Sequence, residues 1–133
     1  MAHVGLTPQA VNMLGGYGVR GREDIEAEKI LADARAVAEA GAFVMVVEGV
    51  MEELATRISK EVGIPVIGIG ASSECDGQVL VTEDMLGLFE RTPRFVKRYH
   101  DLASEISASA AAYRDEVRSR AFPTDEQVYK PKA

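Results

Sequence analysis

Two short apolar runs, each preceded by the pattern of an amphipathic helix, constrain the fold of this chain more than any other feature. Residues 43–47 (FVMVV) and 65–69 (PVIGI) contain no polar side chain. Uninterrupted runs of this length are typical of strands in a parallel sheet, where both faces are covered. We therefore expect residues 43–47 to form a strand that is buried on both faces.

Helical patterns separate these runs. From residue 24 to about residue 40, apolar side chains recur every three or four positions, and Gly41 provides the expected stop. A second pattern of the same kind covers residues 54–62. The alternation predicts βα units of about 20 residues and hence a parallel sheet with helices outside it. Both an open sheet and a closed barrel satisfy this pattern.

Less regular segments flank the βα units. Residues 3–6 resemble the end of a strand, and Thr7 with Pro8 predicts a short helix that ends near residue 14. Glycines are dense in residues 15–21, which indicates a close approach of the backbone to another part of the chain. Residues 78–81 are expected to form a further strand.

The C-terminal third of the sequence is predominantly helical. Apolar side chains keep a three–four spacing from Phe95 to Val117, and Asp101 or Ser104 could cap a new helix within this stretch. The length of 133 residues favours one domain. We expect βα units over residues 1–92, C-terminal helices over 93–122 and a loosely held tail over 123–133.

Composition excludes several classes of partner. The net charge of −6, with no block of like charges, disfavours binding to nucleic acid or to an acidic membrane surface. The single cysteine, Cys75, allows no intrachain disulfide, which fits a reducing cytoplasm. No signal peptide is visible, and no apolar run approaches the roughly 20 residues of a membrane helix. We expect a soluble cytoplasmic protein.

Glu48 is the residue whose position most favours chemistry. It directly follows the apolar run of residues 43–47, at the predicted end of a strand. The carboxyl ends of parallel strands carry the active site in α/β folds, and a carboxylate placed there could act as a general base. The alternative is a side chain that reaches solvent or caps the next helix.

Other candidates each have a structural alternative. His3, at another apparent strand end, could orient a substrate or a carboxylate, or be an ordinary, partly buried polar residue. The small residues 68–73 could bind an anion, or could simply allow tight packing. Glu52 and Glu53 suit a helix N-terminus and are interpreted as structural. No cluster of Asp, Glu or His has metal-ligand spacing, so we expect no metal site within this chain.

Several segments, taken in order, resemble ketopantoate hydroxymethyltransferase. Residues 3–12 (HVGLTPQAVN) are similar to the family segment H-[IVL]-G-L-T-P-Q-x-V-N. Residues 15–22 (GGYGVRGR) are similar to G-G-[YF]-x-V-Q-G-R, with Arg20 in place of the usual glutamine. Further matches to the family's later strands and helix are residues 47–48, 53–55, 64–71 and 76–81. The resemblance extends from residue 3 to about residue 123.

The resemblance implies a fold and a reaction. The family is a (β/α)8 barrel of the phosphoenolpyruvate/pyruvate type, and this chain resembles its C-terminal half: about four parallel strands plus a C-terminal helical extension. The implied reaction transfers a hydroxymethyl group from 5,10-methylenetetrahydrofolate to 3-methyl-2-oxobutanoate. It gives 2-dehydropantoate, in the first step of pantothenate and coenzyme A biosynthesis. The family is usually a homodecamer and requires Mg²⁺.

The resemblance also implies site residues. Glu48 matches the general base, and His3 matches a histidine that lines the substrate pocket. Because a (β/α)8 barrel needs roughly 250 residues, the family's metal ligands are expected in the half that this chain lacks. The chain alone is therefore expected to be inactive.

Two other functions remain open. One is a catalytically incomplete half-barrel that acts as an assembly module, which the missing metal ligands favour for this polypeptide alone. The other is a related lyase or mutase that acts on 2-oxoacids. The match to the G-L-T-P-Q segment favours the hydroxymethyltransferase over the latter.

Overall fold

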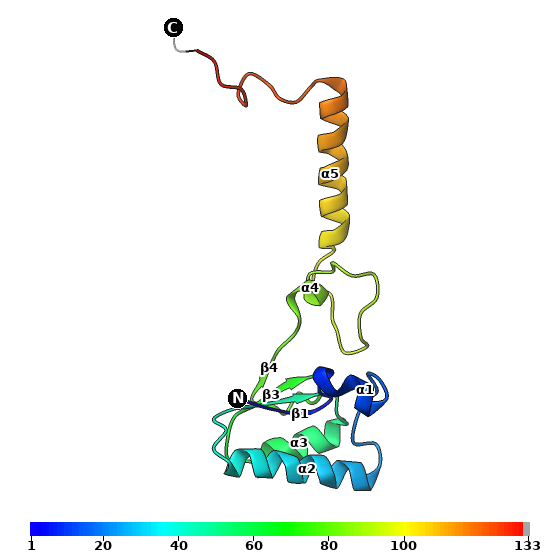
Figure 1. Ribbon diagram of the computed structural model, residues 1–133, viewed down its shortest axis with the longest axis vertical. Coiled ribbons are helices and arrows are strands. Elements are labelled where there is room, and N and C mark those ends of the chain that lie inside the picture. The colour runs from blue at the N-terminus through cyan, green and yellow to red at the C-terminus, as the bar shows by residue number, and fades with distance from the viewer. Residues whose placement is uncertain (132–133) are drawn as a thin grey trace. The chain divides into compact units, whose positions relative to one another are not determined.

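The computed structural model describes residues 1–131, which divide into two compact units at Leu80 and Val81. The first unit contains a four-stranded sheet in the order β1-β2-β3-β4, and every neighbouring pair is parallel (Figure 1). The strands are β1 (Ala2–Gly5), β2 (Met45–Glu48), β3 (Val66–Ile69) and β4 (Gly77–Gln78). The expected parallel α/β architecture is thus confirmed.

Two helices, α2 (Asp24–Glu39) and α3 (Glu52–Glu61), pack against one face of this sheet (Figure 1). Both were predicted from their apolar spacing, and α2 stops at the expected glycine, Gly41, whose φ is +92°. The fully buried core side chains are Leu31, Ala34, Met45, Val47, Ala55, Ile58 and Val66. Burying each large aliphatic side chain contributes about 1.5–3 kcal/mol, so this layer is the main source of stability.

Strand register assigns alternate residues to the two faces. Met45, Val47 and Val66 point toward α2 and α3 on what we call the helix face. His3, Val46, Glu48, Ile67 and Ile69 alternate with them and form the second face. Side chains on this second face are only half-buried.

The prediction that residues 43–47 are buried on both faces is wrong. Phe43 precedes the strand and is 74% exposed, and Val46 is half-buried. The reason is that the layer formed by α2 and α3 covers one side of the sheet. A closed barrel, in which the second face would line the interior, demands the same apolar sequence.

Between β1 and α2 the chain makes a long excursion from the sheet. It contains η1 (Pro8–Ala10) and α1 (Val11–Leu14), in agreement with the predicted short helix. The glycine-rich residues that follow behave differently from one another. A Cβ at Gly21 (φ +74°) would lie 2.5 Å from Leu54 Cδ2, whereas one at Gly15 or Gly16 would meet nothing within 4 Å. The expected close approach is therefore made at Gly21.

Strand β4 is shorter than the predicted strand at residues 78–81. Only Gly77 and Gln78 pair with β3, and Val79 then donates a hydrogen bond to the carbonyl oxygen of Gly68 at 3.0 Å. Val79 and Val81 are about half exposed, at 47% and 46%. The apolar run of residues 79–81 thus continues in the sequence after the backbone has left the sheet.

The second unit contains α4 (Thr82–Met85) and α5 (Leu102–Ser119). The helical spacing predicted from Phe95 onward is wrong for its first part. The Tyr99 amide donates to the Met85 carbonyl oxygen at 2.9 Å, which closes an irregular loop before α5 begins. Asp101 is the N-cap, as predicted: it accepts hydrogen bonds from the Ser104 hydroxyl and amide, which hold its pKa below the ordinary value.

The domain boundaries at residues 92 and 122 stay predictions. Part of the predicted tail, residues 132–133, lies outside the described residues. Within residues 1–131, no helix combines the length and the apolar character needed to cross a membrane.

Candidate active site

Glu48 is the last residue of β2 and lies at the carboxyl edge of the sheet. Its backbone is held from both sides: its carbonyl oxygen accepts the Leu6 amide at 2.8 Å, and the next amide, of Gly49, donates to the Ile69 carbonyl oxygen at 2.9 Å. Its side chain is only 16% exposed. The alternative that Glu48 caps the following helix is wrong, because the N-cap of α3 is Met51.

His3 lies beside Glu48 on the second face. In the register, Gly5 of β1 pairs with Glu48, so His3 is displaced by two residues along the neighbouring strand. The distance from His3 Nε2 to Glu48 Oε2 is 3.1 Å. The imidazole nitrogen is therefore in contact with the carboxylate, but buried Nε2 has no hydrogen-bond partner within the described part of the chain.

The pair lies among apolar neighbours. Val46 precedes Glu48 by two residues and shares its face, and Ile67 and Ile69 occupy that face on the next strand. A carboxylate that is partly shielded from water, beside an imidazole that can orient it, is suited to remove a proton from a bound substrate. The sequence predicted both residues as site candidates, and the fold brings them together.

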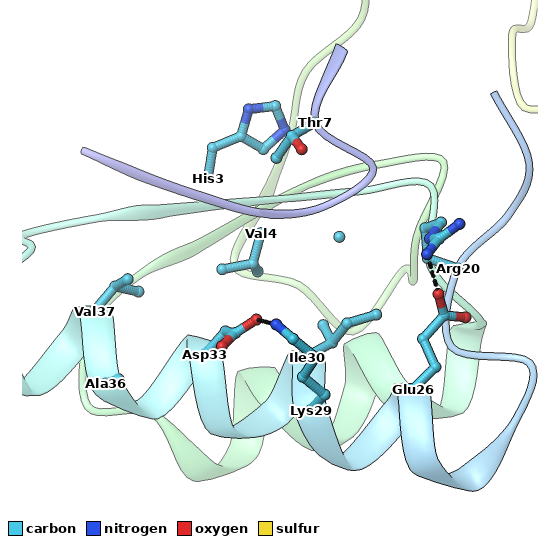
Figure 2. A pocket seen from close by; sticks show the side chains of 11 residues that line it. His3, Val4, Thr7, Arg20, Glu26, Lys29, Ile30, Asp33, Ala36 and Val37 are labelled. Carbon is cyan, nitrogen blue, oxygen red and sulfur yellow. Dashed lines mark hydrogen bonds and ion pairs between the residues drawn. The ribbon is translucent and has the colours of Figure 1, made fainter. Parts of the chain in front are cut away.

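A cleft of about 430 Å³ lies next to His3, along β1 and most of the length of α2 (Figure 2). His3 lines the cleft but Glu48 does not. Figure 2 shows that His3 and Val4 leave β1 on opposite sides, with Val4 directed toward α2. Two ion pairs border the cleft, Arg20–Glu26 and Lys29–Asp33. We therefore regard the cleft as an accessory space next to the site.

The residues of this site do not fit a Mg²⁺ centre. Magnesium prefers octahedral oxygen ligation and usually takes one or two carboxylates together with substrate oxygens and waters. In residues 1–131, no group of three or more His, Cys, Asp or Glu side chains is placed to hold a metal ion. The second face offers one carboxylate, and its neighbour His3 is a nitrogen donor.

The remaining sequence candidates have structural roles. Ser72 is 4% exposed, its hydroxyl lies 2.8 Å from Thr56 Oγ1, and its carbonyl oxygen accepts the Gln78 side-chain amide at 2.8 Å. These contacts support the packing interpretation of residues 68–73. Glu52 and Glu53 begin α3, as expected for helix-stabilising carboxylates.

Sequence reasoning missed one pair of residues near the site. Arg20 was noted only as a departure from the family pattern, and Glu26 was not noted at all. They form an ion pair, and both line the cleft with His3. The available signal was a glutamate in the first turn of a helix, where such side chains often reach back to preceding amides.

The sequence is similar to those of known proteins over almost its whole length. The family profile of ketopantoate hydroxymethyltransferase matches residues 1–125. The 3-methyl-2-oxobutanoate hydroxymethyltransferase of Novosphingobium aromaticivorans is 66% identical over 132 residues, which are 99% of this chain and 46% of that protein. The proteins of that name from Erythrobacter litoralis and Rhodospirillum rubrum are 63% and 57% identical, with the chain spanning 46% and 47% of their lengths and 99% and 97% of itself matched.

The chain thus spans about half the length of the curated relatives that it matches. Its four parallel strands with helices on one side are those of a partial (β/α)8 barrel. The match covers the strands that carry His3 and Glu48. This chain belongs to the ketopantoate hydroxymethyltransferase family.

Proposed function

We propose that this chain supplies the general base for hydroxymethyl transfer to 3-methyl-2-oxobutanoate, giving 2-dehydropantoate. The observation that carries the proposal is the contact of Glu48 with His3 at the carboxyl end of the parallel strands, 3.1 Å apart. Support also comes from the names of the relatives, which are 3-methyl-2-oxobutanoate hydroxymethyltransferases.

In the proposed reaction, an oxygen of Glu48 removes a proton from C3 of the 2-oxoacid. The electron pair of the broken C–H bond becomes the double bond of an enolate. The enolate carbon then forms a bond to the methylene carbon of 5,10-methylenetetrahydrofolate as one of its two C–N bonds breaks. The oxygen of water replaces the second nitrogen on that carbon, which completes the hydroxymethyl group. The two released nitrogens take up one proton from Glu48 and one from water, so that tetrahydrofolate leaves and the carboxylate is restored. His3 orients the Glu48 carboxylate for the first step, and the apolar side chains of the second face exclude water from it.

We further propose that the metal ion and the rest of the site come from protein outside this chain. Mg²⁺ would withdraw charge from the substrate carbonyl oxygen, and the described residues provide no ligand set for it. We also propose that 5,10-methylenetetrahydrofolate is the co-substrate and that the reaction is the first step of pantothenate synthesis. The free thiol of Cys75 suits the reducing cytoplasm in which we expect the protein to act, without a nucleic-acid or membrane partner.

The test uses a chimera in which this chain replaces the matching segment of the Novosphingobium aromaticivorans relative. Exchange of the C3 proton of 3-methyl-2-oxobutanoate with D₂O, followed by NMR, reports the base step without the folate. Glu48→Gln should slow exchange about 10²–10⁴-fold, the usual scale for a lost general base. The matched control is Glu52→Gln, an exposed glutamate in α3 that should leave the rate unchanged. A loss of less than threefold in Glu48→Gln would place the base elsewhere.

An assembly role is the second candidate. No side chain of α5 is fully buried in the described structure, and Ile106, Tyr113 and Val117 are 53%, 58% and 44% exposed. Exposed apolar side chains on one helix favour association, and the family resemblance suggests a homo-oligomer such as a decamer. Light scattering after size-exclusion chromatography tests this role. A monomer that stays active in the chimera would contradict it.

A further inference from the structure

The chain after Glu48 is joined to a distant segment by backbone hydrogen bonds. The Arg20 amide donates to the Gly49 carbonyl oxygen at 2.8 Å, and the Met51 amide donates to the Arg20 carbonyl oxygen at 3.0 Å. These two bonds form a parallel bridge between Arg20 and Val50, outside the four named strands. The excursion over residues 7–19 therefore ends on the connection that links Glu48 to α3.

Arg20 and the residue after it are held by one carboxylate. Glu26 Oε2 accepts the Gly21 amide at 2.7 Å, and Glu26 Oε1 forms an ion pair with the Arg20 guanidinium (Figure 2). The Arg20 and Glu26 side chains are 24% and 28% exposed, so the pair is partly shielded from water. Because Glu26 lies in the first turn of α2, its position follows from a helix whose residues Ile30 and Leu31 are in the core.

The glycines within residues 7–19 have few neighbours, whereas Arg20 and Gly21, which follow this segment, make several contacts. Gly15, Gly16 and Gly18 have nothing within 4 Å of the place where a Cβ would lie. Gly21 is buried and lies against Leu54 of α3. Loss of the contacts at Arg20 and Gly21 would therefore release the Gly49 carbonyl and the Met51 amide, which flank the connection next to Glu48.

We propose that Arg20 and Glu26 act as a positioning pair that holds the 49–51 connection, and through it the Glu48 carboxylate. The role of the pair in turnover rests on the proposed function of Glu48. The role in holding the connection does not depend on it. Small displacements of a base relative to its proton reduce rates steeply, which is why a backbone anchor one residue from Glu48 matters for catalysis.

The first experiment measures backbone opening in this chain by amide hydrogen exchange. Glu26→Gln keeps the size of the side chain and an acceptor oxygen but removes the charge that binds Arg20. We expect the Arg20, Gly21 and Met51 amides to exchange about tenfold faster, because exchange follows local opening. Asp33→Asn is the matched control: it removes the Lys29–Asp33 ion pair of 2.6 Å on the same helix and cleft. Equal exchange in Glu26→Gln and Asp33→Asn would overturn the proposal.

The second experiment measures C3-proton exchange of the substrate in the chimera. Glu26→Gln should lower kcat about three- to tenfold with KM and melting midpoint unchanged, which general loss of folding would not produce. Arg20→Lys, which keeps the charge, should retain most of the rate. In the double variant with Glu48→Gln, the Glu26→Gln change should cause no further loss, since positioning a missing base has no effect.

The outcomes separate the two proposals. A large loss in Glu48→Gln with full activity in Glu26→Gln, or additive losses in the double variant, overturns the positioning role alone. Activity within threefold in Glu48→Gln overturns the proposed base. The hydrogen-exchange result would then still decide whether the pair holds the connection.

Discussion

On the helix face of the sheet, Met45, Val47 and Val66 are fully buried against α2 and α3. On the second face, one residue further along the same strands, Val46 and Glu48 are partly exposed. Because side chains alternate along a strand, the same backbone presents one set of residues to the core and another set to the second face. The helix face holds the fold together, and the second face presents the residues that are suited to chemistry.

The difference also teaches what apolar side chains on a strand mean. Val46, Ile67 and Ile69 are as apolar as the core residues, yet they pack less completely in this chain. Apolar side chains on a strand thus indicate a face that other protein covers, but they do not identify the covering element. In a protein that spans about half of its relatives' length, the second face is the place to look for further contacts.

Substitutions at neighbouring positions of β2 would give the largest contrast in stability. Met45→Ala should lower the free energy of unfolding by about 2–5 kcal/mol, because it leaves a cavity in the core. Val46→Ala, one residue later, should lower it by under about 1.5 kcal/mol. Chemical denaturation of this chain, with the slope of the transition compared between variants, measures both. Equal losses would show that the two faces are equally packed.

His3→Gln should affect catalysis much more than stability, the opposite of what is expected at Met45. Without the imidazole to orient Glu48, exchange of the substrate C3 proton in the chimera should fall about 10- to 100-fold. The free energy of unfolding should change by less than about 0.5 kcal/mol, as for a side chain outside the core. A variant that loses stability and activity together would make His3 a structural residue.

The smallest effect is expected on the outer surface of the helix layer. Hydrogen bonds from Arg57, and then from Arg35, hold the pKa of Glu61 below its ordinary value, and Arg57 also bonds Glu28. The folded state therefore gains stability from ionised Glu61 above the ordinary glutamate pKa of about 4.3, and loses it as the pH falls through the lowered value.

Glu61→Gln should accordingly reduce the melting midpoint slightly at pH 7 and flatten its decline below pH 4.3 or so. These side chains are largely exposed, so added salt should reduce the difference between variant and parent. Thermal unfolding monitored by circular dichroism at several pH values measures this effect. If Glu61→Gln lowered the melting midpoint more than Met45→Ala does, the exposed ion pairs would contribute more to stability than the buried core, contrary to this prediction.

Helices α2 and α3 could be predicted from the sequence because the three–four spacing of their apolar residues is a property of the helix itself. The apolar positions of α2 and α3 were expected to face a core, and Leu31, Ala34, Ile58 and Ala55 do so. The helix predicted from Phe95 onward is wrong in its first part, because side-chain spacing says nothing about contacts with distant residues. Phe95 and Tyr99 continue the helical spacing, but the backbone closes a loop there through the hydrogen bond from Tyr99 to Met85, a contact between residues far apart in sequence.

The candidate site, too, could be predicted only in part from local sequence. The position of Glu48 after an apolar run was enough to place it at a strand end. Its contact with His3 depends on the register between two strands that are separated by about forty residues of sequence, and local pattern cannot supply that register. Arg20 and Glu26 were missed because their proposed role depends on the bridge between Arg20 and Val50, which are thirty residues apart.

Although the end of β4 and the loop before α5 were not predicted, the sequence alone predicted the alternation of strands and helices in the first unit, the place of Glu48 at a strand end, and the family that the segments resemble. Those properties depend on backbone preferences and on side-chain spacing within a few residues. The three-dimensional structure was needed to show that helices cover one face of the sheet, that His3 contacts Glu48, and that Arg20 pairs with the connection after Glu48. Each of these depends on contacts between segments that are distant in sequence, and the side-chain spacing within one segment permits several such arrangements.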